Sequence, residues 1–278
     1  MRDLVSSEWL ASELGAPDLV VLDASWHMPA ANRDGRAEYE ARHIPGARFF
    51  DIDALSDHDA HCPHMLPPAD LFGSAMGDLG VGDRDRIVIY DDSALRTAAR
   101  AWFTLRHFGA RQVAILDGGL AKWLAEARPT EGGYPPERPA RFDAVARGGE
   151  VVGKDEVRRG TGLPLVDARG PGRFTGEEAD PRPGVAAGHI PGARNLPYPA
   201  MYREDGTFRS PEELRAAFAV AGVDPAQPFV ASCGSGVTAN SLIFAAHLLG
   251  NDRARLYDGS WSEWGADPAT PKELGPAS

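Results

Sequence analysis

The segment His43-Ile-Pro-Gly-Ala-Arg48 occurs a second time in the chain, as His189-Ile-Pro-Gly-Ala-Arg194. Two further segments repeat in the same order and at nearly the same spacing: Val20-Val-Leu-Asp-Ala24 as Pro164-Leu-Val-Asp-Ala168, and Leu116-Asp-Gly-Gly119 as Tyr257-Asp-Gly-Ser260. Three matches in one order predict that the chain consists of two copies of one folding unit. With 278 residues in total, each copy is long enough to bury a core of its own.

A segment without apolar periodicity separates the two copies. Between Pro129 and Pro139 the sequence reads PTEGGYPPERP, in which proline and glycine interrupt any helix or strand. We therefore place the boundary near residue 140. The first domain is expected over residues 1–140 and the second over residues 141–278.

Short apolar segments alternate with amphipathic ones in both copies. In the second copy we expect strands at Leu165–Val166, Phe229–Ser232 and Arg255–Tyr257, and helices from Ser210 to Ala221 and over Thr238–Leu249. In the first copy we expect strands at Ile87–Tyr90 and Val113–Leu116, and a helix over Thr97–Phe108. This alternation predicts an α/β fold in which each domain is a mostly parallel sheet flanked by helices.

The composition argues against several kinds of partner and site. The formal net charge is −11 and no block of lysine or arginine stands out, so we expect neither nucleic acid nor an anionic membrane as a partner. No apolar segment is long enough to cross a bilayer, and the N-terminal residues do not resemble a signal peptide, which predicts a cytoplasmic protein. The two cysteines, Cys62 and Cys233, form no CxxC pair. We therefore expect no disulfide scaffold, no metal and no organic cofactor.

The two copies differ most clearly after their central strand. The second copy continues as Ser232-Cys-Gly-Ser-Gly-Val-Thr-Ala239 and the first as Tyr90-Asp-Asp-Ser-Ala94, so that Asp91 stands at the place of Cys233. Turns from a parallel strand into a helix are where α/β proteins bind ligands. A thiol in such a turn is activated by the positive end of the helix, and the neighbouring glycines let backbone N–H groups point inward. We therefore expect Cys233 to be a nucleophile and the first copy to be non-catalytic. A buried Cys233 that only fills space is the alternative.

Duplication also provides an internal control. A feature present in both copies is expected to serve the fold, and a feature confined to one copy is a candidate for function. By this criterion His43 and His189, which both copies carry, are expected to be structural turn residues.

The two HIPGA segments, the CGSGVTA loop over residues 233–239 and the closing DGSWSEW segment Asp258–Trp264 resemble the tandem-domain rhodanese family of sulfurtransferases. The resemblance extends over nearly the whole chain, and the loop is its most specific part. It implies two rhodanese-like domains, with a reaction in which Cys233 takes sulfur from a donor as a persulfide and passes it to a nucleophilic acceptor. The charged sulfur would be stabilised by backbone N–H groups of the loop residues Gly234, Gly236, Val237 and Thr238.

The resemblance also bears on the sulfur donor. Basic residues follow the cysteine in the thiosulfate-specific members of the family, whereas Gly234 and Ser235 follow it here. The neutral loop favours 3-mercaptopyruvate as donor and pyruvate as product, with thiosulfate as the alternative. Arg173 and Arg182 match the family's substrate-binding arginines and would bind the donor carboxylate through paired hydrogen bonds. For either arginine, a surface ion pair is the alternative.

Ser235, His64 and Asp53 match positions proposed in the family as a triad that deprotonates the donor thiol. His64 and Asp53 belong to the first copy, so the resemblance implies that the first domain contributes to the site across the domain interface. The acceptor is left open between cyanide and a thiol such as that of thioredoxin.

Two functions of other kinds fit the sequence less well than sulfur transfer. A cysteine phosphatase needs an arginine at position 239 to bind phosphate, and Ala239 stands there. A non-catalytic sulfur-binding or interaction module would have no need to keep Cys233. Formation of a persulfide on this residue after exposure to a donor would distinguish a sulfur carrier from an inert module.

Overall fold

The computed structural model describes residues 1–277, which form two compact units. The first unit contains residues 1–56, 66–147 and 204–208, and the second contains residues 57–65, 148–203 and those from 209 onward. Each unit therefore includes one short segment from the other half of the sequence. None of the helices within residues 1–277 combines the length and the apolar character needed to cross a membrane.

Residues 141–147 pack with the first unit, so the division lies after the segment where the sequence suggested it. The ring of Phe142 packs edge-on against Phe72, with 5.7 Å between the centroids. The backbone N–H of Val145 donates to the carbonyl of Phe108 at 3.1 Å. A buried aromatic contact and backbone hydrogen bonds hold this segment to the first core.

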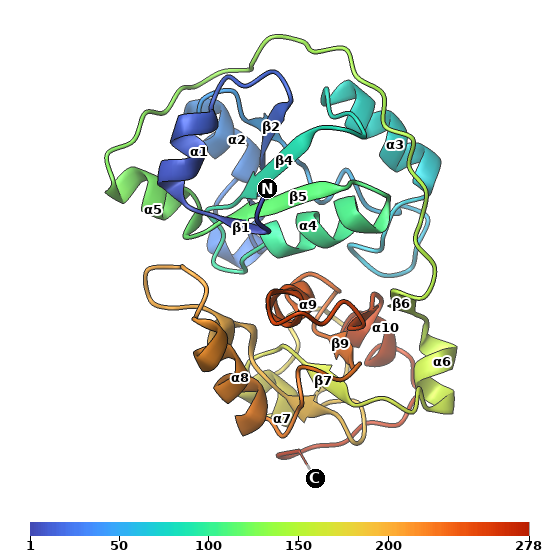
Figure 1. The fold of residues 1–278 in the computed structure, drawn as a ribbon. Helices are drawn as coiled ribbons and strands as arrows, with labels where there is room; N and C mark the ends of the chain where they lie inside the picture. Colours follow the sequence, from blue (N-terminus) through green and yellow to red (C-terminus); the bar gives the residue numbers. More distant parts are fainter. Residues whose placement is uncertain (278) are drawn as a thin grey trace. The chain divides into compact units, whose positions relative to one another are not determined.

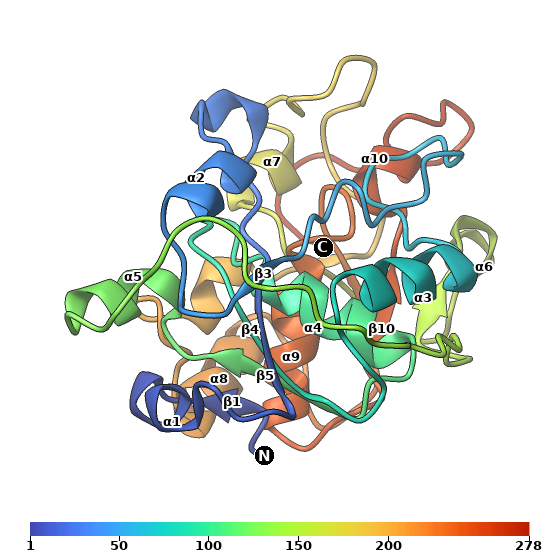
Figure 2. The ribbon, with the colours of Figure 1, turned by 90° about the horizontal axis from the view of Figure 1, so that it is seen from above.

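The first unit is built on a sheet of five strands whose described pairings are all parallel. Their order is β1 (Leu4–Val5), β5 (Gln112–Leu116), β4 (Arg86–Tyr90), β2 (Leu19–Asp23) and β3 (Arg48–Phe49). The helices are α1 (Ser7–Glu13), α2 (Gly35–Ala41), α3 (Ala69–Asp78), α4 (Ala98–His107) and α5 (Gly119–Ala125), with a 3₁₀ turn at Pro29–Ala31. Because strand side chains alternate between faces, Val21, Val88 and Ala114 share one core with Tyr39 of α2 and Trp123 of α5. Helix α4 lies along β4 and β5 (Figures 1 and 2).

The second unit repeats this arrangement. Its strands are ordered β6 (Val151–Val152), β10 (Arg255–Tyr257), β9 (Val230–Ser232), β7 (Leu165–Asp167) and β8 (Arg194–Asn195), again with parallel pairings. The helices are α6 (Lys154–Arg159), α7 (Pro171–Thr175), α8 (Pro211–Val220), α9 (Ala239–Leu248) and α10 (Ser260–Trp264), with a 3₁₀ turn at Tyr198–Met201. The strand order matches that of the first sheet position by position, which confirms the α/β fold and the two copies.

Local signals in the sequence account for the ends of several elements. The Ser210 hydroxyl accepts from the N–H of Glu213 at 3.4 Å, and the Glu213 carboxylate accepts from the N–H of Ser210 at 2.8 Å. This is the expected capping box, and α8 begins directly after it at Pro211. Helix α9 is buried from Ala239 through Ala246.

The two HIPGA histidines have the same structural role in their own units. His43 Nδ1 is 2.7 Å from the carbonyl oxygen of Tyr39, and its ring stacks on that of Tyr39. His189 Nδ1 is 2.9 Å from the carbonyl oxygen of Phe174, and its ring stacks on that of Phe174. Both side chains are fully buried, which agrees with the structural reading of these residues.

Candidate active site

Cys233 opens the loop that joins β9 to α9. Strand β9 ends at Ser232, α9 begins at Ala239, and Thr238 is the N-cap residue with helical backbone angles. The first N–H groups of a helix have no partner within it and form its positive end. The loop therefore borders the positive end of α9, as the sequence predicts. Cys233 itself is 1% exposed.

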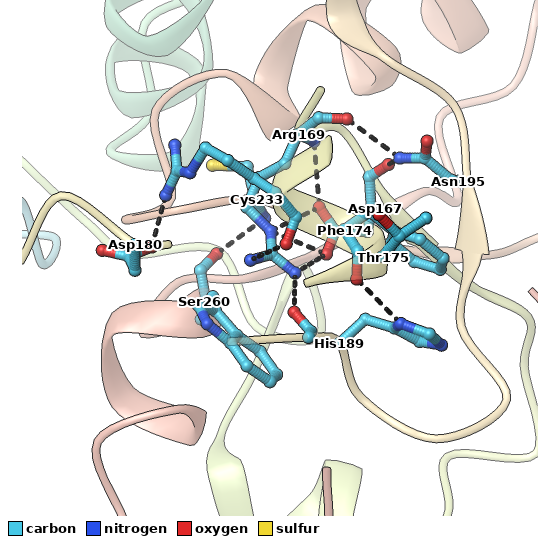
Figure 3. A network of polar contacts seen from close by, with 12 residues as sticks. Asp167, Arg169, Phe174, Thr175, Asp180, His189, Asn195, Cys233 and Ser260 are labelled. Atoms are coloured by element: carbon cyan, nitrogen blue, oxygen red, sulfur yellow. Dashed lines mark hydrogen bonds and ion pairs between the residues drawn. The ribbon is translucent and has the colours of Figure 1, made fainter. Parts of the chain in front are cut away.

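The Ser260 hydroxyl holds the two ends of this loop together. Its Oγ accepts from the N–H groups of Cys233 and Gly236, both at 3.1 Å, and donates to the carbonyl of Tyr257 at 2.8 Å. Figure 3 shows Ser260 beside Cys233. The N–H of Gly236 was expected to face the sulfur, but it is directed to Ser260. Ser260 was not predicted from the sequence, although the change from Gly119 in the first copy was a usable signal.

Two glycines of the loop have different roles. Gly236 has a φ of +73°, and a methyl group on its Cα would lie 2.5 Å from the carbonyl oxygen of Asp258. A methyl group on Gly234 would lie 3.3 Å from both Nη2 of Arg173 and Nη1 of Arg182. The absence of a side chain at Gly234 thus lets two guanidinium groups approach the residue that follows Cys233.

A buried carboxylate connects these two arginines. Asp180 Oδ2 accepts from Arg173 Nη2 at 2.5 Å, and Oδ1 accepts from the backbone N–H and Nη1 of Arg182 at 3.0 and 3.3 Å. The Asp180 side chain is 1% exposed, whereas the arginine side chains are 23% and 26% exposed. Burial alone would raise the pKa of Asp180, but the Arg182 N–H and the Arg173 guanidinium outweigh it and lower the pKa. Asp180 is therefore ionised at neutral pH.

Arg169 is a further buried cation in this region that the sequence analysis missed. Its guanidinium donates to both carboxylate oxygens of Asp167, with distances from 2.6 to 3.1 Å, and to the carbonyl of Gly188 at 2.8 Å. It also lies 4.6 Å from the ring centroid of Trp261, the residue that follows Ser260 in the sequence. Because Asp167 neutralises it, Arg169 fixes the frame of the site and does not offer an anion a free charge. The signal was again a difference between the copies, since Ser25 takes its place in the first.

Two members of the expected triad lie together in the second unit. His64 Nδ1 is 2.8 Å from Ser235 Oγ, and both side chains are buried. His64 has a φ of +64°, a left-handed conformation that is costly for a residue with a Cβ and is often kept at functional sites. Asp53 belongs to the first unit, where its Oδ2 accepts from Trp26 Nε1 at 2.7 Å. Ser235 and His64 thus belong to the same unit. The segment 57–65, which contains His64, groups with the second unit and not with the first.

The other cysteine is in a setting that disfavours its thiolate. Cys62 is a free, half-buried thiol. Burial and the nearby Glu263 carboxylate raise its pKa, and a hydrogen bond with Ser262 offsets this only in part. Since the thiolate is the reactive form, this setting disfavours nucleophilic attack by Cys62 at neutral pH.

The first unit has an equivalent turn with different chemistry. The Ala24 N–H donates to the carbonyl of Tyr90, as the Ala168 N–H does to that of Ser232, so Asp91 and Cys233 follow equivalent residues. Asp91 Oδ1 accepts from the N–H of Ser93 at 3.0 Å, and Oδ2 accepts from the N–H of Ala98 at 2.7 Å. Burial raises the pKa of Asp91 to about 6. The carboxylate is therefore occupied in holding its own turn.

The fold and the turn around Cys233 define a tandem rhodanese-like protein, and the profile of the Rhodanese-like domain matches residues 6–126 and again 153–267. The chain is 43% identical to 3-mercaptopyruvate sulfurtransferase of Homo sapiens, over 95% of this chain and 92% of that protein. It is 41% identical to 3-mercaptopyruvate sulfurtransferase of Escherichia coli strain K12, over 97% of each. The chain therefore belongs to the rhodanese family of sulfurtransferases.

Solved structures with the same fold agree with this assignment. The crystal structure of SseA from Escherichia coli superimposes with a TM-score of 0.85 at 39% identity, covering 95% of this chain and all of that one. The Tum1 protein from Saccharomyces cerevisiae superimposes with a TM-score of 0.89 at 29% identity, covering 99% of each chain. A thiosulfate sulfurtransferase of Rattus norvegicus is also similar, at 40% identity over 95% of this chain and 92% of that one.

Proposed function

We propose that this protein is a 3-mercaptopyruvate sulfurtransferase that carries sulfur as a persulfide on Cys233. The observation that supports this most directly is the convergence of Arg173 and Arg182 on Gly234, next to Cys233. Two guanidinium groups there can bind a carboxylate while the thiolate reaches the donor sulfur a few bonds away. The loop itself contributes no cation that would favour a dianion.

The chemistry balances without an oxidant or a cofactor. The Cys233 thiolate attacks the donor sulfur, an S–S bond forms, and the C–S bond of mercaptopyruvate breaks. The departing carbon becomes the enolate of pyruvate and takes up the proton that the donor thiol lost. The Ser235–His64 pair is the proposed route for that proton, with Asp53 as the orienting carboxylate. A thiol or cyanide then attacks the outer sulfur and restores the Cys233 thiolate.

Thiosulfate is the second candidate donor. The similarity to a thiosulfate sulfurtransferase of the rat, at 40% identity, favours its consideration. We further propose thioredoxin as a thiol acceptor and a cytoplasmic location. We also propose that the protein has no nucleic-acid partner, in keeping with its net charge of −11.

Steady-state assays with both donors test the proposal, first with cyanide as acceptor and then with reduced thioredoxin. We expect a kcat/KM for 3-mercaptopyruvate at least about tenfold above that for thiosulfate, which corresponds to about 1.4 kcal/mol of transition-state binding. Mass spectrometry after donor exposure should find one extra sulfur on Cys233. The reverse preference would make thiosulfate the donor, and inactivity with both would support a non-catalytic module.

A further inference from the structure

Asp180 lies behind the two arginines that converge on Gly234. Its side chain is almost fully buried, whereas about a quarter of each arginine side chain is exposed. The carboxylate is thus buried, while the two guanidinium groups that it binds are partly exposed and approach Gly234, the residue after Cys233. A surface ion pair would have both partners exposed and little influence on position.

The hydrogen bonds of Asp180 fix both guanidinium groups. One carboxylate oxygen binds Arg173 Nη2, and the other binds Arg182 through both its backbone N–H and its Nη1. A free arginine side chain loses considerable rotamer entropy when it binds a ligand, and a group already held in place loses less.

The same carboxylate sets the charge that a donor meets. Arg173, Arg182 and Asp180 together carry one net positive charge. A monocarboxylate balances that charge, whereas a dianion such as thiosulfate would leave a buried negative charge without a partner. Removing the Asp180 charge would give the arginine pair two positive charges.

We infer that Asp180 is a positioning and specificity-determining residue that orients Arg173 and Arg182 and matches their net charge to a monocarboxylate donor. The inference rests on the proposed function, because it concerns how that same site selects its donor. Asp180 acts through the arginines and does not itself touch the donor.

The test compares wild type with Asp180→Asn and Asp180→Glu, using 3-mercaptopyruvate and thiosulfate as donors. Asp180→Asn keeps the side-chain size and removes the charge. We expect the KM for 3-mercaptopyruvate and the inhibition constant of pyruvate to rise, while the kcat/KM for thiosulfate is retained or increases. The ratio of the two kcat/KM values should fall at least about tenfold. Asp180→Glu keeps the charge and shifts its position, so it should weaken both donors and preserve the ratio within about threefold.

Asp85→Asn is the matched control. Asp85 forms a bidentate ion pair with Arg138 in the first unit, and its side chain is 9% exposed. This variant should lose stability without a change in the donor ratio, which separates a general loss of packing from a local effect.

The role inferred for Asp180 can be overturned by the donor ratio or by the KM of the variants. An unchanged donor ratio in Asp180→Asn, or a lower KM for 3-mercaptopyruvate, overturns it, because Asp180 would then be neutral or would compete with the donor carboxylate. If Asp180→Asn does not fold, a donor ratio shifted by Asp180→Glu as strongly as expected for Asn overturns the charge argument. Failure of the proposed function is recognised separately, because wild type would then be inactive with both donors.

Discussion

The turn after β9 and the turn after β4 solve the same structural problem in opposite ways. Each must satisfy backbone N–H groups where a parallel strand passes into a helix. In the first unit the side chain of Asp91 does this from within the turn, by accepting from Ser93 and Ala98. In the second unit the hydroxyl of Ser260 does it from outside, by accepting from Cys233 and Gly236. Supporting the turn from outside leaves the Cys233 side chain free for chemistry.

The residue at the position of Ser260 also differs between the two units. Ser260 has a φ of +51°, and Gly119 at the equivalent place has a φ of +57°. The left-handed backbone is easy for glycine and costs a serine about 1 kcal/mol or more. The serine is kept in that conformation by three hydrogen bonds of its hydroxyl. A strained serine beside the candidate nucleophile thus replaces a relaxed glycine beside the inactive turn.

The largest expected effect is on turnover, and it distinguishes the reactive turn after β9 from the turn after β4. Cys233→Ser should lower turnover by at least about a thousandfold and leave the unfolding transition unchanged, because only the nucleophile is lost. Adding Asp91→Cys to that variant should restore nothing, since Pro29 stands at the place of Arg173 in the first copy. Activity recovered by the second thiol would contradict the division of labour between the copies.

The second effect concerns the pH dependence of stability. Burial raises the pKa of Asp91 to about 6, above its value of 3.8 in the unfolded chain. The stabilising contribution of the protonated form is therefore complete below pH 3.8 and is lost as the pH rises through about 6. By linkage, up to about 3 kcal/mol of the free energy of unfolding is lost over this range.

Urea titrations at several pH values between 4 and 7.5 would measure this loss. Asp91→Asn should have a flatter pH profile than wild type, because its side chain does not titrate. Asp143→Asn, at a side chain that is 61% exposed, serves as the control and should keep the wild-type profile. Parallel profiles for Asp91→Asn and wild type would show that Asp91 does not titrate in this window.

The third effect concerns Ser260, whose hydroxyl supports the turn after β9. Ser260→Ala removes the acceptor for two N–H groups and should lower the free energy of unfolding by about 2 kcal/mol. It should lower kcat/KM by roughly tenfold to a hundredfold, because the loop that carries Cys233 loses its order. Ser56→Ala removes a buried hydroxyl that donates to the Ile52 carbonyl, and should cost stability without this loss of activity. Equal kinetics in both variants would refute the role of Ser260.

The smallest effect should be the same in both copies. His43→Gln and His189→Gln each remove a stacked imidazole and its hydrogen bond to a backbone carbonyl. Each should cost about 1 kcal/mol of stability with no change in the donor ratio. Thermal unfolding together with the two-donor assay would measure both. A selective loss of activity for His189→Gln would give that histidine a functional role beyond the fold.

Repetition made much of this fold predictable, because a pattern that occurs twice can be checked against itself. The strands before Asp91 and Cys233, the capping box at Ser210 and the loop before α9 were all expected from local chemistry. Asp180 was not, because it lies in a segment without helix or strand, where no periodic pattern indicates the direction of a side chain. Ser260 was not, because its role depends on contacts with Cys233 and Gly236, which are distant in the sequence. The grouping of residues 57–65 with the second unit was hidden for the same reason, since no local pattern reports long-range packing.

The grouping of residues 57–65 with the second unit has a consequence for how the chain can be divided into fragments. Residues 57–65, which include His64, belong to the second unit, and residues 204–208 belong to the first. A fragment that began at residue 148 would contain Cys233 and both arginines but would lack the imidazole that contacts Ser235. The two halves of the duplicated sequence therefore cannot be inherited separately without loss of the proposed site. A break at the linker between them would separate the proposed nucleophile from its proposed proton relay.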